Sequence, residues 1–234
     1  MDDIARAKAA AGRRAADFVE DGATLGLGTG STVQPFLERL AERIASEGLT
    51  VRGVPTSEGT AAIARELGIP LASLTEVDRI DLTVDGADEI DPAFDMIKGG
   101  GGALLREKVV ACLSAREVIV VDPAKVVARL GTTFRLPVEV VPFALPVVER
   151  AVRGLGLEPR LRDLTGAAHA GGYRTDNGNA ILDCAAPDGI VDPARLELEL
   201  DAIPGVVESG LFVGLAHTLV VGHPDGTCDV RERA

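Results

Sequence analysis

Tryptophan is absent from this sequence of 234 residues, and all aromatic residues together make up 3% of it. Positive charge is also scarce, because 24 Lys and Arg stand against 36 Asp and Glu and leave a net charge of -12. Proteins hold single-stranded nucleic acids on aromatic side chains and duplexes through clustered Lys and Arg. The two shortages therefore predict no nucleic-acid partner, although a locally positive pocket can still bind a small anion.

Cysteine and histidine are equally sparse, with three of each: Cys112, Cys184, Cys228, His169, His217 and His223. The cysteines are odd in number, lie far apart and lack a CxxC pair, which argues against a disulfide framework and a zinc site. We expect each histidine to be a surface or loop residue rather than a metal ligand. The cysteines and histidines therefore predict no zinc site and a reducing compartment.

Long apolar runs are missing too, since none approaches the ~20 residues that a membrane span needs. The opening Met1-Asp2-Asp3 lacks the basic and apolar regions of a signal peptide. We therefore expect a cytoplasmic location and no membrane contact. Hydrophobic residues still make up 46% of the chain, so Ala, Val, Leu and Ile must build a sizeable core.

The first half of the chain alternates helical and strand patterns. Helices are predicted over 4–19, 31–48, 57–68 and 99–112, and strands over 24–28, 50–54, 80–84 and 118–121. We expect Ser31 and Ser57 to cap their helices, and Gly48 and Gly68 to end them. Strands that alternate with helices at this spacing predict an α/β fold, with a Rossmann-like open parallel sheet as its main domain.

The pattern changes after about Arg129. A helix is predicted over 142–155, a strand over 159–162, a hairpin over 173–184 with its turn at 176–179, and a helix over 193–200. Strands over 206–213 and 218–221 are expected to rejoin the main sheet. The predicted domains are thus 1–129 plus 206–234, and a smaller α+β domain over 130–205.

Three glycine-rich polar segments follow predicted strands, where ligands of open parallel sheets bind. The first runs from Gly26 to Thr32, and its Thr29, Gly30, Ser31 and Thr32 precede a helix whose N–H groups suit a phosphate. A tight, capped turn is the alternative. The dinucleotide fingerprint fails because Ser31 replaces its last glycine, and no Lys-Ser or Lys-Thr of a P-loop follows.

The second segment, from Asp85 to Asp91, places four carboxylates in seven residues at a strand end. They could form a solvated turn, a divalent metal site or a set of acid/base groups. Any one of Asp88 or Asp91 could equally cap a turn. Composition alone leaves these alternatives open.

The third segment is Lys98 with Gly99, Gly100, Gly101 and Gly102, followed by a nearly apolar helix that contains Glu107. At about 100° per residue, Glu107 shares a face with Ala103, Val110 and Ala111. Burial would raise the pKa of such a carboxylate toward that of a proton-abstracting base. An ion pair with Arg106 or Lys108, or an exposed position, is the alternative.

Two further lysines are candidates for phosphate contacts. Lys125 follows the predicted strand over 118–121 and so belongs to the carboxyl edge of the sheet, and Lys8 lies on the first helix. Either could simply be solvated.

Taken together, these segments resemble ribose-5-phosphate isomerase of the A type. The matching stretches run in order through nearly the whole chain: GLGTGST, TSEGTAAIARELGIPL, DLTVDGADEID, MIKGGGGALLREKVVA, VVDPAK, TDNGNAILD and IPGVVESGLF. DGADEI with KGGGGALLREK thirteen residues after Asp85 is a specific combination. The resemblance identifies the smaller domain as ferredoxin-like and implies a homodimer or higher homo-oligomer.

The resemblance also implies the reaction, which converts ribose 5-phosphate to ribulose 5-phosphate in the non-oxidative pentose phosphate pathway through an enediolate. Glu107 would be the base, while Asp85, Asp88 and Lys98 would aid ring opening and stabilise charge on the sugar oxygens. The matching substrate-binding positions are Thr29, Gly30, Ser31, Thr32, Asp85, Gly86, Ala87, Asp88, Lys98, Gly99, Gly100, Gly101 and Lys125.

Other classes remain open at this point. A sugar-phosphate-sensing domain of a transcriptional regulator would bind without catalysis, although this chain lacks a helix-turn-helix. A coenzyme A transferase-like enzyme would use its glutamate as a nucleophile and form a covalent thioester. An amino-sugar phosphate deaminase would release ammonia.

Overall fold

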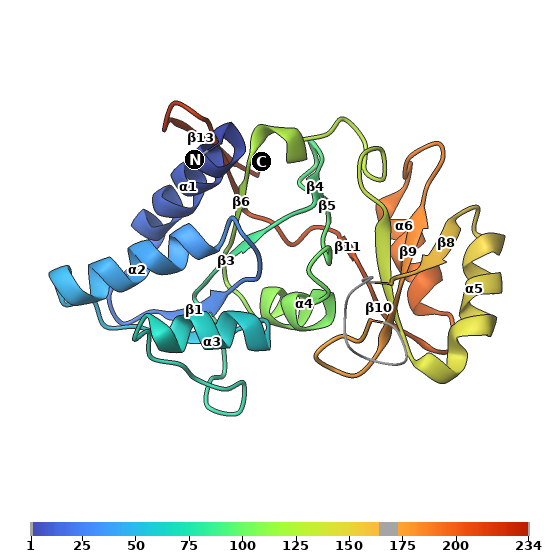
Figure 1. The fold of residues 1–234 in the computed structure, drawn as a ribbon, viewed down its shortest axis with the longest axis horizontal. Helices are drawn as coiled ribbons and strands as arrows, with labels where there is room; N and C mark the ends of the chain where they lie inside the picture. Colours follow the sequence, from blue (N-terminus) through green and yellow to red (C-terminus); the bar gives the residue numbers. More distant parts are fainter. Residues whose placement is uncertain (1, 164–172, 234) are drawn as a thin grey trace. The chain divides into compact units, whose positions relative to one another are not determined.

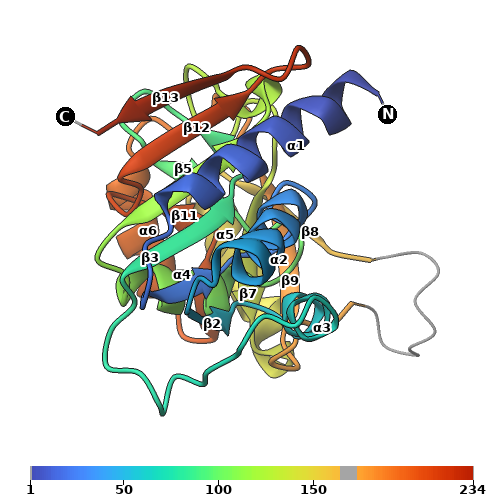
Figure 2. The ribbon, with the colours of Figure 1, turned by 90° about the vertical axis from the view of Figure 1, so that its left-hand side faces the viewer.

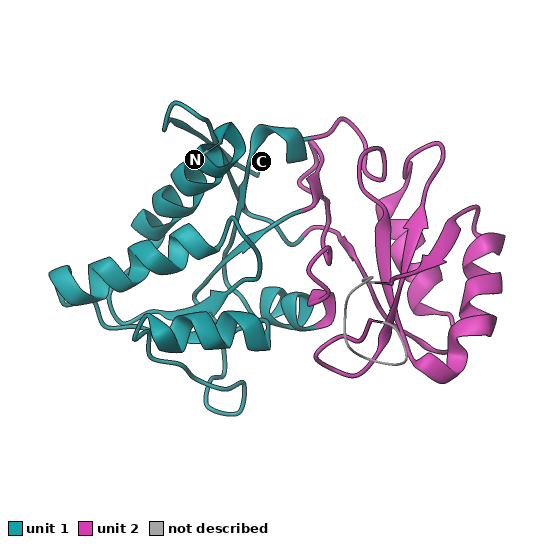
Figure 3. Cartoon of the chain, viewed as in Figure 1, with its two compact units in different colours: residues 1–87, 106–126, 215–234 teal, residues 88–105, 127–214 magenta. Residues whose placement is uncertain are grey.

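The computed structural model describes residues 2–163 and 173–233, and it divides the chain into two compact units (Figure 3). Unit 1 consists of Met1–Ala87, Arg106–Val126 and Leu215–Ala234, and unit 2 of Asp88–Leu105 and Val127–Gly214. Compared with the predicted division at 130–205, unit 2 also includes 88–105, 127–129 and 206–214. Each unit is built around its own sheet and apolar cluster.

Unit 1 contains a six-stranded sheet in the order β13-β12-β6-β3-β1-β2 (Figures 1 and 2). The strands are β1 (Thr24–Leu27), β2 (Arg52–Pro55), β3 (Leu82–Gly86), β6 (Glu117–Val121), β12 (Thr218–Gly222) and β13 (Cys228–Glu232). All neighbours are parallel except β12 and β13, which pair antiparallel at the edge. This arrangement is the open parallel sheet that the sequence predicts.

The helices of unit 1 follow the predicted pattern closely. They are α1 (Asp3–Ala15), the short 3-10 helix η1 (Ala16–Phe18), α2 (Gln34–Glu47), α3 (Glu58–Glu66) and the 3-10 helix η2 (Pro123–Lys125). Ser57 caps α3 by accepting a hydrogen bond from the Thr60 N–H, as expected. The expected cap at Ser31 is wrong, because α2 begins three residues later and Val33 precedes it without a side-chain cap.

The core of unit 1 shows why the chain can manage with few aromatic residues. Helix α1 packs against β12 and β6 through its alanines, and Ala7 and Ala11 are fully buried. The approach is so close that a Cβ on Gly222 of β12 would lie 2.7 Å from the Ala11 backbone nitrogen. Small side chains therefore let the helix lie directly on the sheet, and larger apolar residues such as Leu25 and Phe36 fill the remaining interior.

Unit 2 has the strand and helix order β-α-β-β-α-β of a ferredoxin-like domain. The elements are β7 (Leu136–Val140), the 3-10 helix η3 (Pro142–Ala144), α5 (Leu145–Gly154), β8 (Glu158–Leu161), β9 (Ala180–Ala185), α6 (Pro193–Asp201) and β10 (Val206–Ser209). The four strands form an antiparallel sheet in the order β10-β7-β9-β8. The predicted α/β fold class is confirmed, including its smaller α+β part.

A second, small sheet of unit 2 joins β11, β5 and β4 (Leu211–Phe212, Met96–Ile97, Glu89–Ile90). Helix α4 (Leu104–Cys112) begins in unit 2 and ends in unit 1, so the chain passes from one unit to the other within this helix. In the part of the chain that the structure describes, no helix has the length and apolarity needed to cross a membrane.

Two strand predictions in the second half are wrong. The hairpin expected over 173–184 does not form, because only Ala180–Ala185 is a strand and it pairs with β7 and β8. The stretch 206–213 does not join the main sheet, because β10 pairs with β7 and β11 with β5. The turn before β9 does form, with the Gly178 N–H donating to the Thr175 carbonyl.

Candidate active site

The carboxyl edge of the unit 1 sheet has a topological switch point between β1 and β3. These strands are neighbours, yet β1 leads through α2 to β2 on one side, and β3 leads to β6 on the other. Open α/β sheets bind their ligands beyond the strand ends at such a point. A ligand is therefore expected to bind beside the residues that follow β1 and those that end β3.

Asp85 lies at this switch point, near the end of β3, with 1% of its surface exposed. Its Oδ1 accepts hydrogen bonds from the backbone N–H groups of Thr29 (3.0 Å) and Gly86 (2.7 Å). A Cβ on Gly28 would lie 2.6 Å from the Asp85 Cα and nearer still to its carboxylate. Position 28 must therefore be glycine, because any side chain there would collide with the carboxylate of Asp85.

The Thr29 hydroxyl belongs to a cluster of four hydroxyl groups. Its Oγ1 lies 2.7 Å from Thr56 Oγ1, 2.9 Å from Ser57 Oγ and 3.2 Å from Thr60 Oγ1. Thr56, Ser57 and Thr60 are buried where β2 leads into α3. The hydroxyl of Thr29 is therefore engaged within the protein. The sequence analysis did not predict this cluster. The signal for it was the Thr56-Ser57 pair just after a predicted strand, with Thr60 one helical turn later.

The next residues of this loop are accessible. Gly30 and Ser31 are exposed, Thr32 is half-buried, and Gly30 has a φ of 121° that favours glycine. The ammonium group of Lys8, on α1, donates to Ser31 Oγ at 2.9 Å. The structure thus joins Lys8 to the predicted phosphate loop. A lysine, a hydroxyl and a loop before a helix together suit a phosphate group.

Lys125 ends the short helix η2, which follows β6 directly. The buried Asp122 caps this helix by accepting from the Ala124 N–H at 3.0 Å. Lys125 is half-buried at the carboxyl edge of the unit 1 sheet, as the sequence predicts.

Glu107 lies in the first turn of α4 with 4% of its surface exposed, so the alternative of an exposed position is excluded. Its neighbour Arg106 forms an ion pair with Glu58 of α3 at 2.8 Å. The carboxylate that periodicity placed on an apolar face is therefore a buried one. Buried carboxylates are uncommon without a partner or a function.

The remaining predicted residues belong to unit 2. Asp88 Oδ2 accepts from the Gly100 N–H at 2.7 Å, and the Asp88 N–H donates to the Ile97 carbonyl at 2.8 Å. Lys98 is nearly fully buried, its N–H donates to the Gly210 carbonyl at 2.9 Å, and its Nζ lies 5.4 Å from the centre of the Phe212 ring. Asp88, Lys98 and the glycine loop, defined here as Gly99–Gly102, thus form one connected group.

The predicted site residues divide between the two units. Unit 1 contains Thr29, Gly30, Ser31, Thr32, Asp85, Gly86, Ala87, Glu107 and Lys125, and unit 2 contains Asp88, Lys98, Gly99, Gly100 and Gly101. The chain joins the groups directly, from Ala87 to Asp88 and from Leu105 to Arg106.

The carboxylates of the DGADEID segment have separate tasks. Glu89 is fully buried and accepts four hydrogen bonds of 2.5–2.7 Å from the Gly131, Thr133 and Phe134 N–H groups and the Thr133 hydroxyl. Asp91 accepts from the Ala93 and Asp95 N–H groups of a turn, and burial raises its pKa. Within 2–163 and 173–233, no three His, Cys, Asp or Glu side chains are grouped as metal ligands. His169 lies outside the described residues.

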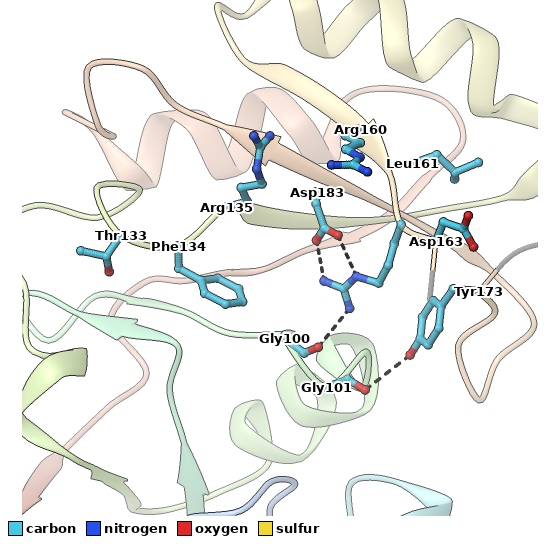
Figure 4. Close-up of a pocket in the computed structure, with 11 residues that line it drawn as sticks. Gly100, Gly101, Thr133, Phe134, Arg135, Arg160, Leu161, Asp163, Tyr173 and Asp183 are labelled. Atoms are coloured by element: carbon cyan, nitrogen blue, oxygen red, sulfur yellow. Dashed lines mark hydrogen bonds and ion pairs between the residues drawn. The ribbon is translucent and has the colours of Figure 1, made fainter. Parts of the chain in front are cut away.

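Unit 2 also contains a pocket that sequence reasoning missed, with a volume of about 700 Å³ (Figure 4). It is lined by Gly100, Gly101, Thr133, Phe134, Arg135, Arg160, Leu161, Arg162, Asp163, Tyr173 and Asp183. Arg162 and Asp183 form an ion pair of 2.5 Å on its wall, and the Tyr173 hydroxyl lies 3.4 Å from the Gly101 carbonyl oxygen. The arginines were the one sequence signal for this pocket, and it was weak, because arginines on or near a short strand usually face solvent.

Fold and site together are those of an α/β enzyme with a buried carboxylate and with groups suited to a small phosphorylated ligand. A family model described as ribose 5-phosphate isomerase A (phosphoriboisomerase A) matches residues 52–226. A relative from Cereibacter sphaeroides, ribose-5-phosphate isomerase A, is 51% identical over 98% of this chain and 92% of its own. The chain therefore belongs to the ribose 5-phosphate isomerase A family, which confirms the predicted resemblance.

Solved structures agree with this membership. Ribose 5-phosphate isomerase A from Methanocaldococcus jannaschii has a TM-score of 0.90 and 40% identity, with 96% of this chain and 97% of that chain covered. A D-ribose-5-phosphate isomerase in complex with phospho-erythronic acid has a TM-score of 0.94 and 38% identity, with both chains fully covered.

Proposed function

We propose that this chain interconverts ribose 5-phosphate and ribulose 5-phosphate by moving a proton between C2 and C1 of the open-chain sugar. The observation that supports this most directly is the buried carboxylate of Glu107, on the helix that follows Lys98 and the glycine loop. The phospho-erythronic acid bound by a relative is a phosphorylated sugar acid, which supports the same substrate class.

In the proposed reaction, Glu107 takes the C2 proton, an enediolate forms, and Glu107 returns the proton to C1. The hydroxyl proton moves from O2 to O1, so that C2 becomes the carbonyl carbon. A positioned base contributes roughly 10²–10⁴-fold to such a step. Asp85, Asp88 and Lys98 aid ring opening and stabilise the charge that develops on the O1 and O2 oxygens, and such preorganised groups often contribute more to the rate than the base does. These protein groups suffice for the chemistry, so we propose that it needs no metal and no redox cofactor.

The phosphate of the substrate is proposed to bind at Gly30, Ser31 and Thr32, with Lys8 as the charged partner through its contact with Ser31. Lys125 is proposed as a further contact to the substrate. Binding energy from this remote group orients the reacting carbons, and it therefore contributes to the rate of the chemical step.

The test is a coupled assay for ribulose 5-phosphate in the presence of EDTA, on wild type and Glu107→Gln. We expect wild type to be active and Glu107→Gln to lose at least about 10²-fold in kcat, because an amide cannot accept the proton. Substrate affinity, measured by calorimetry, should change little. Glu66→Gln on α3 is the matched control with an exposed glutamate.

Two outcomes contradict the proposal in different ways. Activity retained in Glu107→Gln refutes the assignment of the base. An inactive wild type refutes the substrate, and ammonia release or a thioester trapped by hydride reduction would indicate another reaction.

We also propose that the protein forms a homodimer or a higher homo-oligomer. Phe143 is 95% exposed and Val147 is 53% exposed on neighbouring turns of η3 and α5. Neighbouring exposed apolar side chains that form a continuous patch mark protein–protein contact surfaces. Analytical ultracentrifugation of wild type and Phe143→Ser tests this, and a monomeric wild type contradicts it.

The proposed location is the cytoplasm. The three cysteines suit a reducing compartment, and Cys112 is exposed on the surface. Cell fractionation checks the proposal.

A further inference from the structure

We propose that Arg162 is a positioning residue for the isomerase reaction, because it fixes the peptide groups of the glycine loop beside Lys98. Arg162 follows β8 directly and is only 8% exposed. Its Nη1 donates to the carbonyl oxygens of Gly99 (3.0 Å) and Gly100 (3.2 Å). One buried side chain thus holds two consecutive peptide groups of the loop.

Asp183, on the neighbouring strand β9, fixes the orientation of the Arg162 guanidinium. Its carboxylate accepts from Nε at 2.9 Å and from Nη2 at 2.5 Å (Figure 4). Such two-pronged pairs set the plane of the guanidinium as well as its position. The direction of the Nη1 donors toward the loop is therefore determined by the unit 2 sheet.

The peptide group between Gly99 and Gly100 is held at both edges. Arg162 binds its oxygen, and Asp88 Oδ2 accepts from its N–H at 2.7 Å. Because a peptide group is planar, these two bonds together prevent its rotation. Glycines would otherwise leave the loop many backbone conformations, and the positive φ of 102° at Gly99 is one that other residues rarely adopt.

The consequence concerns the residues attached to this loop. Asp88 is bound to it, Lys98 precedes it, and α4 with Glu107 follows it. If the Gly99–Gly100 peptide rotated, Asp88 would lose the N–H that orients its carboxylate. This inference rests on the proposed function, in which Asp88 and Lys98 act on the sugar oxygens. Arg162 acts through them.

The experiment compares Arg162→Ala and Arg162→Lys with Arg160→Ala, a control on an exposed arginine of β8. We expect Arg162→Ala to lose about 10- to 100-fold in kcat, as misplaced catalytic groups do. KM should change much less, because the proposed phosphate contacts lie elsewhere. Arg162→Lys should be only partly active, because one ammonium cannot replace the planar fork.

Two further readouts separate positioning from general stability. Hydrogen exchange in peptides covering 98–105 should accelerate in Arg162→Ala, while peptides from β1 and β3 keep their wild-type rates. Millimolar guanidinium, far below denaturing concentrations, should restore part of the kcat of Arg162→Ala and leave Arg160→Ala unchanged.

The inference is overturned if folded Arg162→Ala has the kcat of wild type, or if kcat falls while exchange over 98–105 stays normal. Should Arg162→Ala fail to fold, Arg162→Lys decides by the same two measurements. If the proposed function is wrong, the wild type will lack isomerase activity. The exchange measurement still tests whether Arg162 holds the glycine loop through its two hydrogen bonds.

Discussion

The backbone N–H of Thr29 donates to the carboxylate of Asp85 at 3.0 Å, and this bond joins the ends of β1 and β3. The two residues are 56 positions apart in sequence. A carboxylate at the switch point of the sheet is thus oriented by the loop that we propose to bind the phosphate. Disturbing either partner should affect the other.

Gly28→Ala tests this relationship. The new Cβ would be 2.6 Å from the Asp85 Cα, so either the strand ends separate or the carboxylate moves. We expect a loss of about 1–3 kcal/mol in the free energy of unfolding, as for other overpacked sites. The kcat should fall as well. Urea unfolding followed by circular dichroism and the coupled assay measure the two effects.

Gly59→Ala is the control, because Gly59 lies in the first turn of α3 and its nearest neighbour to a new Cβ is Ser57 Oγ at 3.8 Å. Unchanged or slightly higher stability is expected there, since alanine favours helices over glycine. A Gly28→Ala protein as stable and active as Gly59→Ala would show that the Asp85 position is not constrained in this way.

Lys8→Met should weaken substrate binding more than it slows turnover. A hydrogen bond to a charged group contributes about 1.5–3 kcal/mol, so we expect KM to rise roughly 10- to 100-fold. Inorganic phosphate should inhibit wild type competitively and inhibit Lys8→Met far less. Arg13→Met on the same helix, where Arg13 pairs with Glu42, is the control. Equal inhibition of all three proteins would remove Lys8 from the phosphate site.

The phenol of Tyr173 should titrate at a pH above its ordinary value of about 10. Burial raises its pKa, and the positive charge of Arg162 opposes this only in part. The sequence has one Tyr and no Trp, so the ultraviolet absorbance of the phenolate reports this group alone. A native midpoint at or below the midpoint in urea would contradict the pocket geometry.

The sign of the linked stability change follows from the same shift. The folded protein retains the phenolic proton longer than the unfolded chain, so the free energy of unfolding should fall as the pH rises above about 10. Below that pH the phenol is protonated in both states, so Tyr173 should not contribute to the pH dependence of the free energy of unfolding. Tyr173→Phe should weaken this alkaline dependence.

The three cysteines should react with a maleimide in a fixed order. Cys112 is exposed, burial raises the pKa of Cys228, and burial together with the charge of Asp183 raises the pKa of Cys184 to about 12. Because the thiolate is the reactive form, Cys112 should be labelled first and Cys184 only on unfolding. Mass spectrometry of tryptic peptides checks the order, and early labelling of Cys184 would contradict its burial.

Local signals explain how much of unit 1 could be predicted. Helix α3, for example, was marked by Ser57 at its start and Gly68 after its end, and the apolar stretch of β6 needed no partner to be recognised. Strand β7 was missed because Pro137 and Glu139 interrupt its apolar pattern. The structure accommodates Glu139 by hydrogen bonds from Thr175, Asn177 and Asn179, which are distant in sequence.

The same distinction holds for the candidate site. The burial of Glu107 could be predicted, because helical periodicity alone places this residue on an apolar face. The roles of Glu89 and Arg162 could not, since the first depends on N–H groups more than 40 residues away and the second on Asp183 and the glycine loop. Side chains whose partners are set by the tertiary fold leave no periodic signal.

Strand β12 has a consequence for synthesis of the chain. It lies inside the unit 1 sheet, between β6 and β13, yet β7 to β11 all come between β6 and β12 in sequence. Until a ribosome has translated Thr218–Gly222, β6 has no neighbour on that side and α1 lacks much of the surface it covers. An unpaired strand edge can join another chain, so nascent copies on one messenger are exposed to mutual association until β12 has been made.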